Sequence, residues 1–218
     1  INKNYMNTKN ISIALKCKNI LGESCFWDFR GNSLFWSDIE GKKIWKLDNK
    51  NQSFNFNLSD RAGFILPRKN EGYVIGFPKS IVISNKDFSS FEKICEVEIG
   101  IKGTRINDAK VDPYGGIVFG TYNEDSDKKN RKPIANLYRL APDLSLTHLL
   151  SNITVSNGLA FSQKDNIMYF ADTPTGLIKK FSYNRDFKKI DELESNMIFK
   201  DIGEPDGATL DIDCLLYT

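Results

Sequence analysis

The chain has 218 residues, of which 40% are hydrophobic and 27% are charged, as is ordinary for a folded globular domain. With 30 basic and 28 acidic residues, the formal net charge of +2 gives no reason to expect nucleic acid or an anionic membrane as a partner. No apolar run approaches the roughly 20 residues that cross a bilayer. The polar first ten residues lack the apolar stretch of a signal peptide. We therefore expect one cytoplasmic domain over residues 1–218.

Cysteine and histidine usage restricts the chemistry further. The four cysteines, Cys17, Cys25, Cys95 and Cys214, are scattered and form no C-x-x-C pair, which favours reduced thiols in a cytosolic protein. The alternative is two disulfides in a secreted protein. The only histidine, His148, lies in a strand-like stretch without a neighbouring catalytic partner, which argues against His-based catalysis and against a His/Cys zinc site. Any metal ion should therefore be held by oxygen ligands.

Five segments of the chain share one layout. Each is expected to open an apolar strand, followed by a polar turn and a second apolar strand. Third strands are expected at KIWKLD, LYRLAPD and IKKFSY. The landmarks at which the five segments begin are Trp27, Leu66, Val111, Phe161 and Leu210. Their spacing of about 40–50 residues is the period of a β-propeller blade, whereas a β-sandwich shows no self-similarity at that length. The sequence thus predicts an all-β propeller.

The last residues, Leu215–Thr218, fall within an apolar strand. A propeller removes its exposed sheet edges by closing its first and last strands onto each other. We therefore expect residues 1–218 to be a C-terminally truncated fragment of about four and a half blades, with the remaining blades beyond residue 218.

Oxygen-bearing side chains recur at one phase of this repeat. The positions four residues before the landmarks are Glu23, Ala62, Asn107, Asn157 and Asp206. Residues at the same position of successive blades lie at the same height along the central axis of a propeller. The four oxygen-bearing side chains in this set should therefore converge. Carboxylate and amide oxygens suit Ca²⁺, Mg²⁺ or Mn²⁺, and two carboxylates without a cation would repel each other. The alternative interpretation is local, because Asn-Gly and Asp-Gly are strong turn signals.

Arg105 precedes Asn107 by two residues, so strand alternation puts both side chains on one face. A guanidinium beside a metal ion could clamp a hydroxylated or anionic substrate. A surface salt bridge is the alternative for Arg105.

Four motifs occur in a fixed order along the chain. They are G-E at 22–23, R-I-N-D-A-K-V-D-P-Y-G at 105–115, S-N-G-L at 156–159 and P-D-G at 205–207. Together with their flanking stretches, from about residue 20 to the end of the chain, they resemble the regucalcin–gluconolactonase (senescence marker protein) family of six-bladed propellers. The combination is specific, although no single motif is.

The resemblance implies one divalent metal ion, Ca²⁺, Mg²⁺, Mn²⁺ or Zn²⁺, in the central channel. Its implied ligands are Glu23, Asn157 and Asp206, and Asp206 is also the implied general base.

The resemblance also implies substrate contacts from Arg105 and Asn107. In some members of the family an acidic residue after the G-T-x motif contacts the substrate. Asp125 is the residue we assign to that role, with Glu124 as the alternative match.

The function that follows is a lactonase, a metal-dependent hydrolase that opens sugar lactones to aldonic acids. The channel cation would act as a Lewis acid on the lactone carbonyl, and Asp206 would take a proton from water. The alternative is a non-catalytic propeller of the regucalcin type that binds calcium or a small ligand, although a bare metal site does not need Arg105 and Asn107. A third possibility, an interaction platform, predicts a surface patch that the sequence does not clearly show.

Overall fold

The computed structural model describes residues 12–127, 130–199 and 203–218, and the described chain is almost entirely β-strand. The first sheet contains β1 (Gly22–Asp28), β2 (Ser33–Asp38), β3 (Lys43–Asp48) and β4 (Ser53–Asn57). The second contains β5 (Phe64–Pro67), β6 (Tyr73–Phe77), β7 (Ser80–Ser84) and β8 (Phe91–Glu96). The third contains β9 (Thr104–Val111), β10 (Ile117–Asn123), β11 (Ala135–Leu140) and β12 (Leu146–Ile153).

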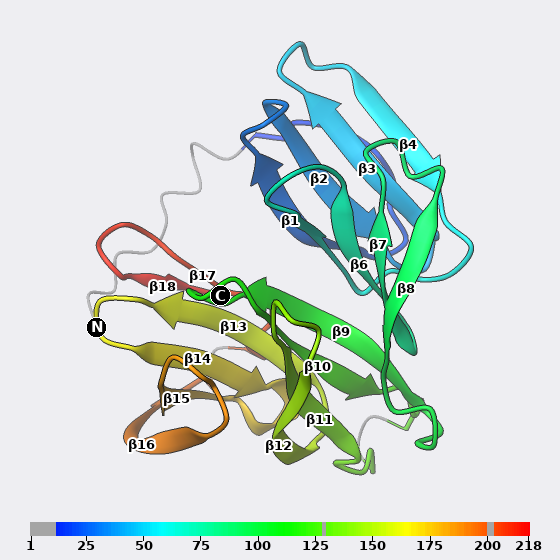
Figure 1. The fold of residues 1–218 in the computed structure, drawn as a ribbon. Coiled ribbons are helices and arrows are strands. Elements are labelled where there is room, and N and C mark those ends of the chain that lie inside the picture. Colours follow the sequence, from blue (N-terminus) through cyan, green and yellow to red (C-terminus); the bar gives the residue numbers. More distant parts are fainter. Residues whose placement is uncertain (1–11, 128–129, 200–202) are drawn as a thin grey trace.

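The fourth sheet contains β13 (Ser156–Ser162), β14 (Ile167–Asp172), β15 (Leu177–Tyr183) and β16 (Ile190–Ile198), with a 3₁₀ turn at Thr173–Thr175. A two-stranded sheet of β17 (Thr209–Leu210) and β18 (Leu216–Tyr217) follows. Within each four-stranded sheet the antiparallel neighbours are consecutive in the chain. Figure 1 shows β9, β13 and β17 near the middle of the molecule and β4 and β16 at its periphery. This is the blade arrangement of a β-propeller, with four four-stranded sheets and one two-stranded sheet among the described residues.

The predicted phase of the repeat needs one correction. Trp27, Phe161 and Leu210 were expected to open the first strand of their segments, but they lie at or next to the end of β1, β13 and β17. Val111 likewise ends β9, and Leu66 is the third of four residues in β5. The polar turn therefore follows each landmark directly, because the apolar residue anchors the end of a strand rather than its start. As a result, Glu23, Asn107 and Asn157 lie inside the innermost strands.

The hydrophobic core is divided into three clusters, each between consecutive sheets. Between the first and second sheets lie Phe35, Ile44, Ile75, Phe88 and their neighbours. The cluster between the second and third contains Phe64, Ile81, Ile106 and Phe119. The third and fourth are joined by Leu137, Leu159, Phe170, Phe181 and Phe187. Burying apolar surface between sheets, at about 25 cal/mol per Å², is therefore what fixes the blades relative to one another.

One ion pair is deeply buried at the end of the third sheet. The Nε of Arg139 donates to Oδ2 of Asp112 at 2.6 Å, and the two residues are 5% and 3% exposed. The other carboxylate oxygen of Asp112 accepts the backbone N–H groups of Tyr114 and Gly116, which closes the turn between β9 and β10. Arg139 also lies over the ring of Phe187, in the connection between β15 and β16 of the fourth sheet. This pair therefore connects a turn, a strand and the neighbouring sheet.

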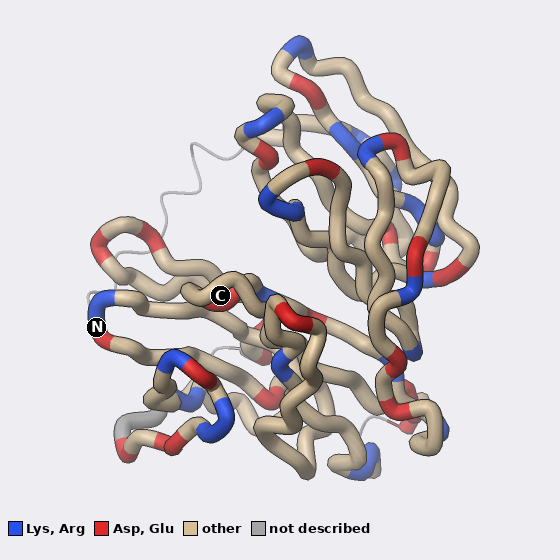
Figure 2. Tube along the Cα trace, viewed as in Figure 1, with Lys and Arg blue, Asp and Glu red and all other residues tan. Residues whose placement is uncertain are grey.

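Several sequence predictions can be compared directly with the structure. All four cysteines are free, so the expectation of unpaired thiols is confirmed. His148 lies in β12, where its ring contacts Asn136, Ser151 and Tyr138. Within the described ranges, no helix has the length and apolar character needed to cross a membrane. Lys, Arg, Asp and Glu are interspersed along the chain rather than segregated by sign (Figure 2).

Candidate active site

The innermost strands of three sheets carry a β-bulge at the predicted site positions. In β1 the pairing with β2 shifts between Glu23 and Phe26, and in β13 the pairing with β14 shifts between Asn157 and Ala160. In β9 the shift spans Asn107 and Asp108. A bulge adds one residue to a strand and re-aims its side chains, and bulges are frequent beside active sites. Positive φ angles at Ser24 (56°) and Gly158 (68°) accommodate two of the three bulges.

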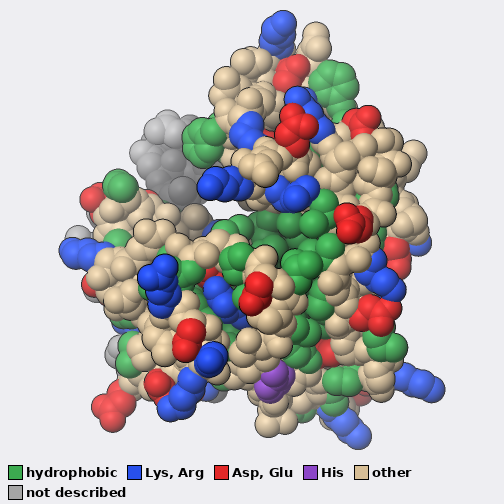
Figure 3. Space-filling view, viewed as in Figure 1, with side chains coloured by type: hydrophobic (Ala, Val, Ile, Leu, Met, Phe, Trp, Pro, Cys, Tyr) green, Lys and Arg blue, Asp and Glu red, His purple; other side chains and the backbone are tan. Residues whose placement is uncertain are grey.

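The three bulges bring their polar side chains to a single cavity. Glu23, Asn107 and Asn157 all line a space of about 1790 Å³, together with Asp108 of the third sheet. Most of the other lining residues are apolar. Figure 3 shows a hollow lined by hydrophobic side chains between the upper and lower parts of the molecule. The structure therefore places these three side chains around one cavity.

The amides are fixed by hydrogen bonds between neighbouring sheets. Nδ2 of Asn107 donates to Oδ1 of Asn157 at 3.1 Å and to the carbonyl of Ser156 at 2.9 Å. Nδ2 of Asn157 donates to Thr173 at 2.9 Å. Oδ1 of Asn157 accepts the hydrogen bond from Asn107, and because an amide oxygen has two lone pairs, the second can serve a ligand.

Arg105 lies behind Asn107 and is only 5% exposed. Its Nη1 donates to Oδ1 of Asn107 at 2.7 Å and to the carbonyl of Ile106 at 3.0 Å. The guanidinium also lies over the ring of Tyr122, 4.6 Å from its centroid. The predicted pair of Arg105 and Asn107 therefore forms one hydrogen-bonded unit, and the salt bridge considered as the alternative is present as well, because the buried guanidinium is 3.5 Å from Glu124.

Asp206 lies on the fifth sheet's side of the cavity. Its backbone carbonyl is 3.6 Å from the position that a Cβ on Gly158 would occupy, so it approaches the bulge that carries Asn157. Its side chain is exposed, and its Oδ1 accepts the N–H of Gly207. Asp206 is not among the residues that line the cavity, although its charge acts on Glu23.

Glu23 lies near other carboxylates in a buried environment, which disfavours its charged form. Burial, followed by the nearby carboxylates of Asp206 and Asp108, raises the pKa of Glu23 to about 7, against a smaller opposing effect of Arg105. Burial likewise raises the pKa of Asp108 to about 6. A cation among these carboxylates would stabilise their charged forms.

The donor set is one that a hard divalent cation accepts, since it offers two carboxylates and an amide oxygen. Within the described part of the chain, no three His, Cys, Asp or Glu side chains are grouped closely enough to hold a metal ion by themselves. A metal site here would therefore depend on the amide of Asn157 beside Glu23 and Asp206.

Comparison with known proteins adds independent information about this arrangement. The family described as "SMP-30/Gluconolactonase/LRE-like region" matches residues 21–218. The chain belongs to this family. Its four sequence motifs all lie within the matched region, so the predicted resemblance is confirmed.

Individual relatives carry two kinds of name. "Putative sugar lactone lactonase YvrE" of Bacillus subtilis (strain 168) is 30% identical over 202 residues, covering 91% of this chain and 67% of the relative. Regucalcin of Danio rerio is 30% identical over 215 residues, covering 97% of this chain and 72% of the relative. A solved structure of regucalcin from Agrobacterium tumefaciens, described as a calcium-binding protein, has a TM-score of 0.79 at 18% identity and shows the same fold. It covers 90% of this chain and 66% of the other. The chain thus spans about two thirds of the length of these relatives.

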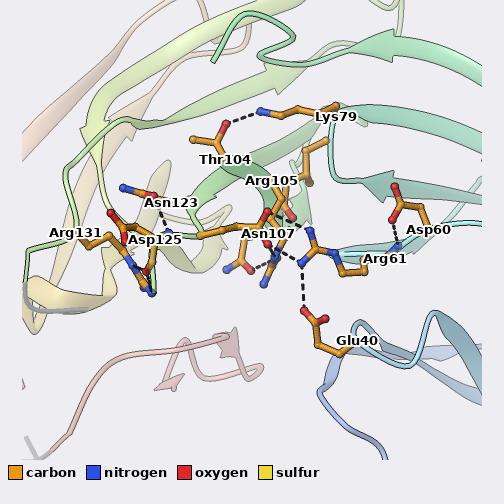
Figure 4. A network of polar contacts seen from close by, with 12 residues as sticks. Glu40, Asp60, Arg61, Lys79, Thr104, Arg105, Asn107, Asn123, Asp125 and Arg131 are labelled. Carbon is orange, nitrogen blue, oxygen red and sulfur yellow. Dashed lines mark hydrogen bonds and ion pairs between the residues drawn. The ribbon is translucent and has the colours of Figure 1, made fainter. Parts of the chain in front are cut away.

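Of the two acidic residues considered after the family's G-T-x motif, Glu124 is the one beside Arg105. Oε1 of Glu124 is 3.5 Å from Nε of Arg105. Asp125 is exposed; its Oδ1 accepts the N–H of Asp127, and its carbonyl accepts Arg131. Figure 4 shows Asp125 next to Arg131, on the opposite side of Arg105 and Asn107 from Arg61. The sequence could not separate the two residues, because strand β10 ends at Asn123 and the side-chain directions beyond it depend on the loop.

Sequence reasoning did not identify Arg61. This residue lies in the loop between β4 and β5, directly before Ala62, where the repeat carries no oxygen ligand. Its Nη1 and Nη2 donate to the two carboxylate oxygens of Glu124 at 2.6 and 3.1 Å. Arg61 would have been found by also considering the residues next to each repeat position, and not only the repeat position itself.

Proposed function

We propose that this protein is a metal-dependent lactonase that opens sugar lactones to aldonic acids. One observation carries the proposal: Glu23, Asn107 and Asn157, from three different sheets, line one cavity, and a buried Arg105 donates to Asn107. The names of relatives support it, because one is named as a sugar lactone lactonase. A six-bladed ring, of which residues 1–218 provide four complete blades and part of a fifth, is the architecture that we propose for the whole protein.

The proposed cation site consists of Glu23, Asn157 and Asp206. A divalent cation there would supply Lewis-acid polarisation of the lactone carbonyl. The raised pKa of Glu23 and the free lone pair of Asn157 fit this role. The description of the Agrobacterium regucalcin as a calcium-binding protein also supports a divalent ion.

The protein's own residues would bind the substrate and move one proton. Arg105 and Asn107 would hydrogen-bond to hydroxyl groups of the lactone ring. Glu124, rather than the more distant Asp125, would accept a hydrogen bond from a further hydroxyl group. Fixing the lactone in this way lowers the entropic part of the barrier. Asp206 would accept a proton from the attacking water as the carbonyl carbon is attacked, a step worth about 10²–10⁴-fold in rate when a general base is well placed. The ring C–O bond then breaks, and the alkoxide takes up a proton to give the aldonic acid.

The direct test is proton release from a panel of five- and six-membered sugar lactones. The protein is assayed with chelator and then with Ca²⁺, Mg²⁺, Mn²⁺ or Zn²⁺ restored, while circular dichroism monitors folding. We expect hydrolysis that is lost with chelator and recovered with at least one metal ion. Metal binding by folded protein without hydrolysis of any lactone would contradict the proposal and favour a calcium- or ligand-binding propeller.

A substitution at Glu23 tests the metal site separately from turnover. Glu23→Gln keeps the shape of the side chain but removes one charged ligand. We expect the dissociation constant for the activating metal, measured by isothermal titration calorimetry, to rise by about 100-fold, since loss of an outer partner alone costs about 10–100-fold. Glu71→Gln changes an exposed glutamate in the turn between β5 and β6 and serves as the control. Equal metal affinity in wild type and Glu23→Gln would remove Glu23 from the ligand set.

A further inference from the structure

The second and third sheets meet beside Asn107 through one carboxylate. Arg61, in the loop before β5, donates hydrogen bonds to both carboxylate oxygens of Glu124, which follows β10. The guanidinium of Arg61 also donates to Glu40 at 3.3 Å. Figure 4 shows Arg61 reaching towards Arg105 and Asn107 from the opposite side to Arg131 and Asp125. Since a guanidinium fork binds a carboxylate in one plane, Glu124 is held in a single orientation.

The loop that carries Arg61 is fixed against the third sheet. A Cβ on Gly63 would lie 2.4 Å from the carbonyl oxygen of Ile106 and 2.8 Å from that of Asn107, so only glycine permits this approach. The hydroxyl of Ser37 donates to the carbonyl of Ala62 at 2.7 Å, which anchors the same loop to the first sheet. Arg61 is therefore presented to Glu124 from a position that the backbone determines.

Arg105 contains an unused donor that faces the same carboxylate. Its Nε is buried and has no hydrogen-bond partner, and the distance of 3.5 Å to Oε1 of Glu124 is too long for a good charge-assisted hydrogen bond. A buried donor without a partner is unfavourable, because it has lost its hydrogen bonds to water and gained none in the protein. The cost would be relieved if Glu124 moved onto Arg105, so something must hold Glu124 back.

Building on the proposed function, we infer that Arg61 is a positioning residue that holds Glu124 away from Arg105 and so keeps the Nε of Arg105 available for a substrate hydroxyl. Arg61 and Arg105 compete for one carboxylate, and Arg61 prevails because its two Nη atoms engage both oxygens. Arg105 would then offer a donor, and Glu124 an acceptor, to one hydroxyl group beside Asn107. Without Arg61, Glu124 would close onto Arg105 and fill that position.

The test is a double-mutant cycle of Arg61→Met and Glu124→Gln, with KM and kcat measured on D-glucono-1,5-lactone. We expect Arg61→Met to raise KM by about 10–100-fold, the equivalent of one charge-assisted hydrogen bond, with a much smaller change in kcat. A glutamine at position 124 carries no negative charge to pair with Arg105, but its amide oxygen can still accept a hydrogen bond from a hydroxyl group. The double variant should therefore bind substrate better than Arg61→Met alone, and Arg61→Lys should restore part of the affinity.

If Arg61 had only a structural role, adding Glu124→Gln to Arg61→Met would not improve substrate binding. Additive losses in the double variant, or an unchanged KM in Arg61→Met, would overturn the inference. Arg68→Met, at the far end of β5, is the control for the loss of an arginine from the second sheet.

Binding of D-glucono-1,5-lactam, a close analogue of the lactone that resists hydrolysis, is measured by calorimetry on the same variants. The expected order of affinity is wild type, then the double variant, then Arg61→Met. This readout separates the two proposals. Lactam binding in that order without turnover of the lactone would overturn the proposed hydrolysis and keep the role of Arg61. Turnover by the wild type, together with equal lactam affinity in all variants, would overturn the role of Arg61 and keep the proposed hydrolysis. The absence of both binding and turnover would overturn both.

Discussion

Replacing Asp206 by alanine is expected to reduce lactone hydrolysis by at least about 10³-fold, effectively to background. Two proposed contributions are lost together, a ligand of the cation and the general base, and the base alone is worth about 10²–10⁴-fold. The charge of Asp206 acts on Glu23, so its removal also changes the environment of the other carboxylate. The measurement is kcat/KM by proton release at saturating metal, because saturation separates loss of the base from loss of metal affinity.

Asp213→Ala is the matched control, because it removes an exposed carboxylate from the turn between β17 and β18. It should retain wild-type turnover. An Asp206→Asn variant should recover metal affinity but not the rate, since an amide oxygen can ligate a cation but cannot accept the proton. Wild-type rates in Asp206→Ala with metal retained would exclude Asp206 as the base.

The largest effect on stability is expected for Asp112→Ala. The substitution leaves the 5% exposed Arg139 charge without its partner and frees the N–H groups of Tyr114 and Gly116. Breaking a buried pair by removing one member costs about 3–5 kcal/mol, a large part of the typical stability of a domain. Chemical denaturation monitored by tryptophan fluorescence gives the change in unfolding free energy.

Two further variants identify the cause of this loss. Asp112→Asn can still accept the turn's backbone N–H groups but cannot neutralise Arg139, so most of the loss should remain if charge dominates. Asp211→Ala removes the corresponding turn aspartate of the fifth sheet, whose Oδ1 accepts the N–H groups of Asp213 and Leu215 at a partly exposed position. Its expected cost is well below that of Asp112→Ala, because only ordinary hydrogen bonds in a solvent-facing turn are lost. Equal losses at the two positions would mean that burial of the ion pair is irrelevant.

The blade repeat was predictable because its signal is local. A strand ending in an apolar landmark, followed by an Asp-rich or Gly-rich turn, recurs with little change, and the family's motifs occur within it. The phase within the strand was not predictable in the same way. Landmarks such as Trp27 and Val111 end their strands, and an alternating apolar pattern does not distinguish the beginning of a short strand from its end.

The candidate site was predictable only where it follows the repeat. Glu23, Asn107 and Asn157 share one phase, and they line one cavity. Arg61 and Glu124 lie on loops from different sheets, and their contact depends on the close approach at Gly63. A contact between residues 63 positions apart that depends on tertiary packing has no periodic signature in a single sequence.

The bulges in β1, β9 and β13 also have an evolutionary consequence. Each polar side chain is aimed by an irregularity confined to its own sheet, while the apolar clusters between sheets hold the sheets together. A lineage could therefore re-aim Glu23 within the first sheet, whereas Asn107 and Asn157 are hydrogen-bonded to each other and are constrained to change together. A site divided between sheets in this way lets one side chain change while the frame that the apolar clusters hold stays the same.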